Sequence, residues 1–335
     1  MQGKQVSEAA LEAVLNRFLD DEHHLVFGFE KTPGGAGHRI FKGIVEGLSL
    51  FNPSFDVNGA LYLRRLFAKG PKMVLLLRPC EIRAYNELTK LTQVERESII
   101  AVSVDCFGAV SSKNKPGDLP VDGRELKDYF ESSKDMRQAC KTCSERRGVV
   151  GDAGIRIDEA GNLWACSYTP RGEALVEMIE GPTAEIPKKL LIENPATERF
   201  QTDMEQFSKD FEACIMCKNC RDMCPVCYCI DCVFNGDEYL PKGDALLNKV
   251  FRTGSMGMPP GKEVFHLIRM FHVSQVCVGC GSCEEACPQS IPLTRYFKGV
   301  SERLQALFSY QSGRSFDEEI PYLTFKEDEL HDAED

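Results

Sequence analysis

Two runs of four cysteines in the last third of the chain combine a residue type and a spacing that can hold metal. Both follow C-x2-C-x2-C-x3-C-P, a spacing at which thiolates hold [4Fe-4S] clusters. The first run consists of Cys214, Cys217, Cys220 and Cys224, and the second of Cys277, Cys280, Cys283 and Cys287. At this spacing three cysteines bind one cubane, and the fourth binds the neighbouring cluster. The runs therefore predict a pair of clusters with exchanged fourth ligands.

The predicted ligand sets follow from this exchange. Cluster 1 takes Cys214, Cys217, Cys220 and Cys287, and cluster 2 takes Cys277, Cys280, Cys283 and Cys224. A structural zinc site also uses C-x2-C pairs, but zinc needs neither a third cysteine at the same spacing nor a second copy of the pattern. Gly279 and Gly281 allow the backbone to approach the cluster, so that N–H groups can bond to its sulfur. Exchanged ligands hold the two clusters close together, which predicts electron transfer between them.

Sixteen cysteines in all leave eight outside the two runs. Three of these, Cys227, Cys229 and Cys232, directly follow the first run. They are interpreted as packing around cluster 1, and a further cluster is the alternative. Cys166 is interpreted as a packing residue, with a role as substitute ligand of a third site as the alternative.

Four cysteines of the N-terminal half form a third candidate site. Residues 73–77 and 99–104 are short apolar runs separated by a helical stretch, which is typical of a parallel β-α-β unit buried on both faces. Cys80 and Cys106 follow these strands, and the carboxyl ends of parallel strands meet at one edge of a sheet. Cys140 and Cys143 form a C-x2-C pair. A [4Fe-4S] site fits these four residues, and a zinc site, a redox dithiol or buried structural cysteines are open alternatives.

The elements that must position these sites divide the chain into three parts. Residues 1–191 alternate helical and strand-like patterns, which predicts an α/β domain with a mostly parallel sheet. A proline-rich linker is expected within residues 181–200, and residues 192–300 are expected to form a small bacterial-ferredoxin-like (α+β) dicluster domain. Helical spacing in EVFHLIRMFHVSQ predicts an inserted helix between the two runs. Residues 301–335 are expected to form an acidic C-terminal tail.

Charge and composition exclude several classes of function. The 335 residues are 43% apolar, and 51 acidic against 40 basic residues give a net charge of −11. Nucleic-acid binding is not expected, because phosphate contacts need clustered Lys and Arg. The chain has no run of about 18 apolar residues and no signal-like start, so neither a membrane span nor export is expected. The thiols are therefore expected in a reducing cytoplasm.

Three short segments and the two cysteine runs together resemble a known family. The segments are RPCEIRAYNELTKL, VDCFG and CKTC. With the two runs behind them, they resemble the beta subunits of coenzyme F420-reducing hydrogenases and formate dehydrogenases, including bacterial relatives that accompany heterodisulfide-reductase-like complexes. The resemblance covers nearly the whole chain. It implies a third [4Fe-4S] cluster on Cys80, Cys106, Cys140 and Cys143, and a bound FAD.

The flavin is the point at which this sequence departs from the family. Archetypal members read roughly G-T-P-C where this chain reads Leu77-Arg78-Pro79-Cys80. Arg78 is a candidate contact for a flavin phosphate or another anion, and an ion pair with Glu81 is the alternative. The glycines of TPGGAGH lack the strand and helix context of a dinucleotide fingerprint and are interpreted as a turn. The sequence therefore leaves both FAD and coenzyme F420 open.

Two histidines lie in the predicted inserted helix. His266 and His272 flank Arg269 at helical spacing. They are candidates for hydrogen bonds that tune cluster 2 or for contact with a partner, and a packing or surface role is the alternative. The chain has no G-x-S-x-G, H-E-x-x-H or P-loop motif, so hydrolysis is not indicated.

Together these features predict an electron-transfer subunit of a cytoplasmic oxidoreductase complex. It would relay electrons between a two-electron site and a partner subunit through three [4Fe-4S] clusters. The expected partner is a formate dehydrogenase, a hydrogenase or a heterodisulfide-reductase-like flavoprotein. One alternative is a self-sufficient FAD enzyme acting on coenzyme F420 or NAD(P)H, and another is a redox sensor or scaffold with structural clusters. Whether the chain is an enzyme by itself is left open by the sequence.

Overall fold

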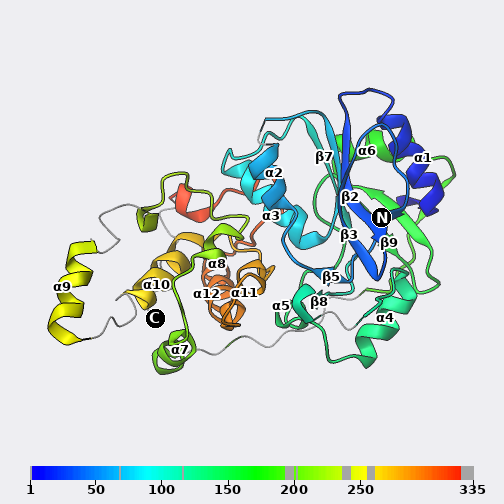
Figure 1. The fold of residues 1–335 in the computed structure, drawn as a ribbon. Helices are drawn as coiled ribbons and strands as arrows, with labels where there is room; N and C mark the ends of the chain where they lie inside the picture. The colour runs from blue at the N-terminus through cyan, green and yellow to red at the C-terminus, as the bar shows by residue number, and fades with distance from the viewer. Residues whose placement is uncertain are drawn as a thin grey trace.

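The computed structural model describes residues 2–67, 69–114, 117–192, 200, 203–235, 243–254 and 261–325. A sheet dominates the N-terminal part and helices dominate the C-terminal part (Figure 1). The strands are β1 (Gln2–Val6), β2 (Leu25–Thr32), β3 (Gly35–Phe41), β4 (Leu48–Ser49), β5 (Ser54–Phe55), β6 (Met73–Leu77), β7 (Ile99–Val104), β8 (Val110–Ser111), β9 (Ala153–Ile157), β10 (Leu163–Ser167) and β11 (Thr183–Glu185).

The helices are interspersed with these strands as far as β11, and the described elements after β11 are helices and 3-10 turns. They are α1 (Glu8–Phe18), α2 (Ala60–Leu66), α3 (Pro79–Lys90), α4 (Gly123–Ser132), α5 (Gln138–Lys141), α6 (Pro170–Glu177), α7 (Met204–Phe211), α8 (Asn219–Asp222), α9 (Gly243–Thr253), α10 (Lys262–Val273), α11 (Ser282–Glu285) and α12 (Leu293–Leu307). Single 3-10 turns form at η1 (Ser112–Asn114), η2 (Val233–Asn235) and η3 (Pro321–Leu323).

The main sheet is mixed, with a parallel centre. Its strand order is β11-β1-β10-β9-β7-β6-β2-β3, and β4 pairs with β2. The neighbours β2, β6, β7 and β9 are parallel, and the strands at both edges pair in antiparallel fashion. Helix α3 connects the parallel strands β6 and β7, so the predicted β-α-β unit is present. Within the segment TPGGAGH, Pro33 and Gly34 form the predicted turn between β2 and β3, and the residues from Gly35 onward belong to β3.

Strand β6 shows why these apolar runs form the centre of the sheet. All five of its residues are buried. Alternate side chains point to opposite faces, so Leu76 packs in the same core as Leu15 of α1, while Leu75 packs in the same core as Leu88 of α3. Burial of each such leucine is worth about 1.5–3 kcal/mol. Because helices cover both faces, a strand without polar residues is stable at this position.

The C-terminal part has a separate core built from aromatic side chains. Phe211 of α7, Phe265 of α10 and Tyr296 of α12 are buried together there, beside several of the cysteines. The regular elements among the described residues from 203 onward are helices and 3-10 turns, and none of these residues lies in a strand. The small sheet that an α+β ferredoxin-like domain implies is therefore not among the described residues, whereas the predicted inserted helix is present as α10.

The segment after α12 packs on the N-terminal part. Asn86 of α3 donates a hydrogen bond from Nδ2 to the carbonyl of Gly313 (2.8 Å), and Tyr310 donates from its hydroxyl to Glu87 Oε1 (2.6 Å). Helix α12 runs across the predicted boundary at residue 300, so the residues that follow it belong to the fold as far as residue 325. The acidic end of the predicted tail, residues 326–335, lies outside the described residues. None of the helices found in the described ranges has the length and apolar character of a membrane span.

Candidate iron-sulfur centres

The third candidate site lies at the carboxyl edge of the parallel strands. Cys80 is in the first turn of α3, directly after β6, and Cys106 follows β7. The same cavity is lined by Cys140 and Cys143, so the structure brings together the four cysteines that the sequence grouped. Cys280 of the second run lines this cavity as well. The third site therefore adjoins the cysteine runs instead of lying apart in the N-terminal domain.

Burial shapes the acid-base properties of these thiols. It raises the pKa of Cys106 to about 12 and also raises the pKa of Cys143. A reactive dithiol at Cys140 and Cys143 would call for a lowered thiol pKa, whereas the pKa of Cys143 is raised. Buried thiols of this kind become thiolates when a metal displaces their protons. The donor set and its burial fit a metal cluster.

The two cysteine runs adopt the same local backbone. Met216 and Lys218 of the first run have φ of 54° and 63°, and Gly279 and Gly281 of the second have φ of 69° and 71°. Each loop is followed by a helix of one turn, α8 in the first run and α11 in the second. The first loop adopts this left-handed conformation without glycine, at a cost of about 1–2 kcal/mol per residue. Two loops with the same unfavourable turns indicate a shared function as ligand loops.

The first run and the last cysteine of the second run meet at one cavity. Cys214, Cys217, Cys220 and Cys287 all line it, together with apolar residues such as Phe265 and Ile291. Burial raises the pKa of Cys220 to about 11. Cys217 is exposed, whereas Cys214, Cys220 and Cys287 are buried. This grouping matches the ligand set proposed for cluster 1, including the exchanged fourth residue.

The four cysteines proposed as ligands of cluster 2 also lie close together. Burial raises the pKa of Cys283 well above its usual range, and Cys224, Cys277 and Cys280 raise it further through their proximity. Cys277 has a pKa raised to about 11, again mainly by burial. Cys224 comes from the first run and the other three from the second. In both groups, three cysteines of one run therefore lie close to the fourth cysteine of the other run.

His266 and Arg269 reach the cysteines from the inserted helix α10. His266 is buried, and its Nε2 lies 3.3 Å from Cys214 Sγ. Arg269 donates a hydrogen bond from Nη1 to Cys220 Sγ (3.0 Å). The sequence suggested that His266 tunes cluster 2, but its nearest thiol belongs to the set of cluster 1. His272 is exposed on the same helix.

Comparisons with known proteins support a relationship over most of the chain. The beta subunit of the F420-dependent formate dehydrogenase of Methanocaldococcus jannaschii is 25% identical over 349 aligned residues, covering 86% of this chain and 87% of that protein. The beta subunit of F420-dependent formate dehydrogenase 1 of Methanococcus maripaludis is 26% identical over 372 residues, covering 86% and 92%. The chain is a homologue of these beta subunits. No family model matches it.

One solved structure of another protein also aligns with this chain. A chain of the F420-reducing [NiFe] hydrogenase complex from Methanosarcina barkeri aligns with a TM-score of 0.35 and 13% sequence identity. The alignment covers 52% of this chain and 76% of that chain.

The remaining cysteines of the beta-subunit homologue have varied surroundings. Cys166 is buried in β10, and its Sγ lies 3.7 Å from the carbonyl of Trp164. Cys227 is half-buried beside the C-terminal core, Cys232 packs against the same core, and Cys229 is exposed. Within the described ranges, no three His, Cys, Asp or Glu side chains are grouped to hold a single metal ion. The assignment of clusters therefore rests on the shared cavities and loops.

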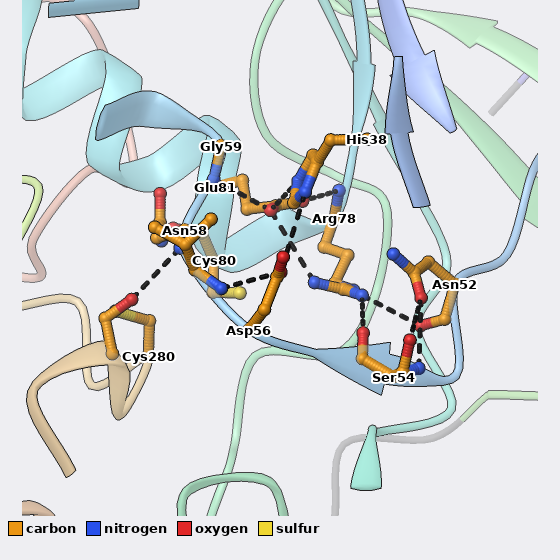
Figure 2. A network of polar contacts seen from close by, with 12 residues as sticks. His38, Asn52, Ser54, Asp56, Asn58, Gly59, Arg78, Cys80, Glu81 and Cys280 are labelled. Atoms are coloured by element: carbon orange, nitrogen blue, oxygen red, sulfur yellow. Dashed lines mark hydrogen bonds and ion pairs between the residues drawn. The ribbon is translucent and has the colours of Figure 1, made fainter. Parts of the chain in front are cut away.

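Arg78 is held inside the protein by a network that Figure 2 shows. Its Nη2 donates to the carbonyls of Asn52 (2.9 Å) and Ser54 (2.5 Å), and its Nη1 lies 3.6 Å from Glu81 Oε1. The ion pair with Glu81 that the sequence suggested is present. Nε and Nη1 of Arg78 are buried and have no hydrogen-bond partner, and the side chain lines the cavity of the third site. The guanidinium therefore lies beside a site with four thiols.

Sequence reasoning missed Arg137 and left Arg269 without a role. Arg137 precedes Cys140 by three residues and donates from Nη2 to the carbonyls of Gly281 (2.9 Å) and Cys280 (3.2 Å). The only sequence signal was the position of each arginine within one turn of a ligand or of a histidine. Such proximity does not say which way a side chain points. Both contacts depend on the docking of segments that are far apart in the sequence.

Proposed function

We propose that the chain is the iron-sulfur electron-transfer subunit of a cytoplasmic oxidoreductase complex. Its homologues are subunits of F420-dependent formate dehydrogenases. Three groups of four cysteines would hold [4Fe-4S] clusters, which supply one-electron steps when bound. The reducing cytoplasm is the compartment in which so many free thiols persist. A formate dehydrogenase, a hydrogenase or a heterodisulfide-reductase-like flavoprotein would be its partner.

One observation supports a continuous path more than any other. Cys280, a proposed ligand of cluster 2, also lines the cavity of the third site. Figure 2 places Asn58 between Cys80 and Cys280, and its backbone N–H donates to Ser282 Oγ (3.0 Å). The order third site, second site, first site follows. The exposed Cys217 of the first site then marks the end of the path that is open to a partner.

Iron analysis tests this proposal. Anaerobically purified protein should contain about twelve irons per chain, because three sites each hold four. The Cys80→Ala variant should lose about four of these while the signals of the other two clusters persist. An iron content of about four in the wild-type protein would refute the proposal of three clusters.

A second candidate function is a complete flavoenzyme that acts on coenzyme F420 or NAD(P)H. It is favoured by a cavity of about 550 Å³ that touches both Cys143 and Cys277, proposed ligands of two different clusters. Arg83 and Lys298 line this cavity and would suit a phosphate. FAD, when bound, would convert two-electron into one-electron steps. Stoichiometric flavin together with reduction of the isolated chain by either donor would favour this function, and failure of both donors would favour the relay alone.

A further inference from the structure

Arg269 is a buried cation that contacts a thiol of one proposed site and lies near two thiols of the next. It is 2% exposed and donates from Nη1 to Cys220 Sγ (3.0 Å) and from Nη2 to the carbonyl of the same residue (2.9 Å). The thiols of Cys224 and Cys283 also lie near enough to interact with the charge of Arg269. Cys220 belongs to the set of cluster 1, and the other two belong to the set of cluster 2.

Arg137 occupies the corresponding place between the second and third sites. It is 8% exposed, and its Nη2 donates to the carbonyls of Gly281 and Cys280 in the second ligand loop. The same side chain lines the cavity of the third site, where its Nη1 is buried without a hydrogen-bond partner. The guanidinium lies over the ring of Phe55, 3.7 Å from its centroid. The side chain is therefore fixed in position with one N–H group free.

Two other buried cations, Arg83 and Lys298, also lie near the second and third sites, since both line the cavity that contains Cys143 and Cys277. Arg83 and Lys298 donate to main-chain carbonyls, those of Ser312 and Thr142 respectively. Arg78 reaches the third site alone and is paired with Glu81. Arg137 and Arg269 each donate a hydrogen bond to a proposed ligand cysteine, to the carbonyl of Cys280 and to Cys220 respectively.

We propose that Arg137 and Arg269 are positioning residues that each hold one positive charge at a junction between successive clusters and raise the reduction potentials of both neighbours. This inference rests on the proposed function. A buried cation stabilises the more negative, reduced form of an anionic cluster, and the effect is large where water is excluded. Each arginine also offsets the repulsion between an electron on one cluster and an electron on the next.

The two arginines are expected to differ in how much they raise the reduction potentials of their neighbouring clusters. Glu285 Oε2 lies 3.3 Å from Arg137 Nε, so a carboxylate offsets part of that charge. Arg269 forms no ion pair with a carboxylate among the residues that the structure describes. Arg269 should therefore have the larger effect on its two neighbouring clusters.

The test is a redox titration followed by EPR on the full chain with its clusters. The Cys80→Ala and Cys217→Ala variants each remove one site and so assign the signals. Arg269→Gln should lower the midpoints of clusters 1 and 2 and leave the third unchanged. Arg137→Gln should lower the midpoints of the third cluster and cluster 2 and leave cluster 1 unchanged. Arg269→Lys should show a smaller shift of the same sign.

Glu285→Gln is the matched control, because it removes the carboxylate beside Arg137. It should shift the third cluster and cluster 2 in the opposite direction, toward higher potential. Unchanged midpoints in both glutamine variants would overturn the inference, as would equal shifts of all three clusters in either one. If a glutamine variant does not assemble its clusters, the lysine variant at the same position, Arg269→Lys or Arg137→Lys, decides the question through the same pattern of smaller shifts. The iron content of the wild-type protein tests the proposed function separately.

Discussion

Glu81 is a fully buried carboxylate held between two basic side chains. Its Oε1 lies 2.7 Å from His38 Nε2 and accepts a hydrogen bond from the backbone N–H of Gly59 (2.9 Å). Its Oε2 accepts from the backbone N–H of Arg78 (3.0 Å), which caps helix α3. Burial opposes ionisation, but Arg78 and His38 lower the pKa of Glu81 to about 2. The carboxylate thus fixes the residues on either side of Cys80.

Substitution of Glu81 should therefore destabilise the fold. Glu81→Gln leaves Arg78 buried without its counterion, and breaking a buried pair in this way costs about 3 kcal/mol. We expect a clearly lower midpoint in chemical denaturation. Glu205→Gln is the control, because Glu205 pairs with Lys209 on the surface of α7 and the change should cost less than about 0.5 kcal/mol. Equal midpoints for the two variants would contradict this account of the network.

Three glycines have nearly the same φ but different neighbours, so alanine substitutions at these positions can distinguish backbone strain from steric contact. Gly254, Gly279 and Gly281 have φ of 69°, 69° and 71°. A Cβ at Gly254 would meet no atom of the described residues within 4 Å. One at Gly279 would meet the flexible Lys298 side chain at 3.1 Å, and one at Gly281 would meet Ala139 Cβ at 2.6 Å. Each alanine variant carries the same strain of about 1–2 kcal/mol, so differences between them report the neighbours.

Gly281→Ala should be the most damaging variant in this series. Ala139 lies in α5, one residue before Cys140, so a methyl group at position 281 pushes apart the second ligand loop and the third site. We expect iron to be lost from both sites in this variant, whereas Gly254→Ala should keep its full iron content and Gly279→Ala nearly so. Iron per chain and the unfolding midpoint measure the outcome. Similar losses in all three would show that backbone strain alone matters.

The sequence predicted the elements whose patterns are local. The apolar runs at 73–77 and 99–104 became β6 and β7, since a strand buried on both faces needs no polar residue. The antiparallel edges were not predicted, because the hairpin of β9 and β10 is recognisable only beside its partner strands. The cysteine runs predicted their own loops. The contacts of Arg137 and Arg269 could not be predicted, because each depends on how distant segments dock.

At the scale of the whole molecule, the two parts are joined next to the proposed clusters. Arg83 of α3 donates from Nε to the carbonyl of Ser312 (2.7 Å), and Lys113 donates from Nζ to the carbonyl of Cys287 (2.8 Å). Ser111 in β8 donates its hydroxyl to Glu285 at the end of α11 (2.5 Å). Figure 1 shows α5 and β8 on the side of the N-terminal part that faces α11. A rigid joint of this kind keeps successive sites at fixed separation.

Paired cysteine variants test the exchange of ligands that this architecture requires. Removing one ligand should cost a site its cluster or part of its iron, and removing a second ligand of the same site should add little. Cys214→Ala combined with Cys287→Ala should therefore lose about as much iron as either change alone, at most about four atoms per chain. Cys287→Ala combined with Cys277→Ala should lose the sum of the two single losses, although both residues belong to the second run.

The reciprocal pairs complete the argument. Cys224→Ala with Cys277→Ala should behave as one site, and Cys224→Ala with Cys214→Ala as two. The opposite pattern would be that two cysteines of the same run behave as one site. In that case each run would bind one whole cluster, and the cavity that Cys287 shares with the first run would have no role in ligation. Because every comparison uses the same four positions, an overall loss of stability cannot imitate the expected pattern. The result would decide whether the two runs fold as one unit around two clusters or as two separate loops.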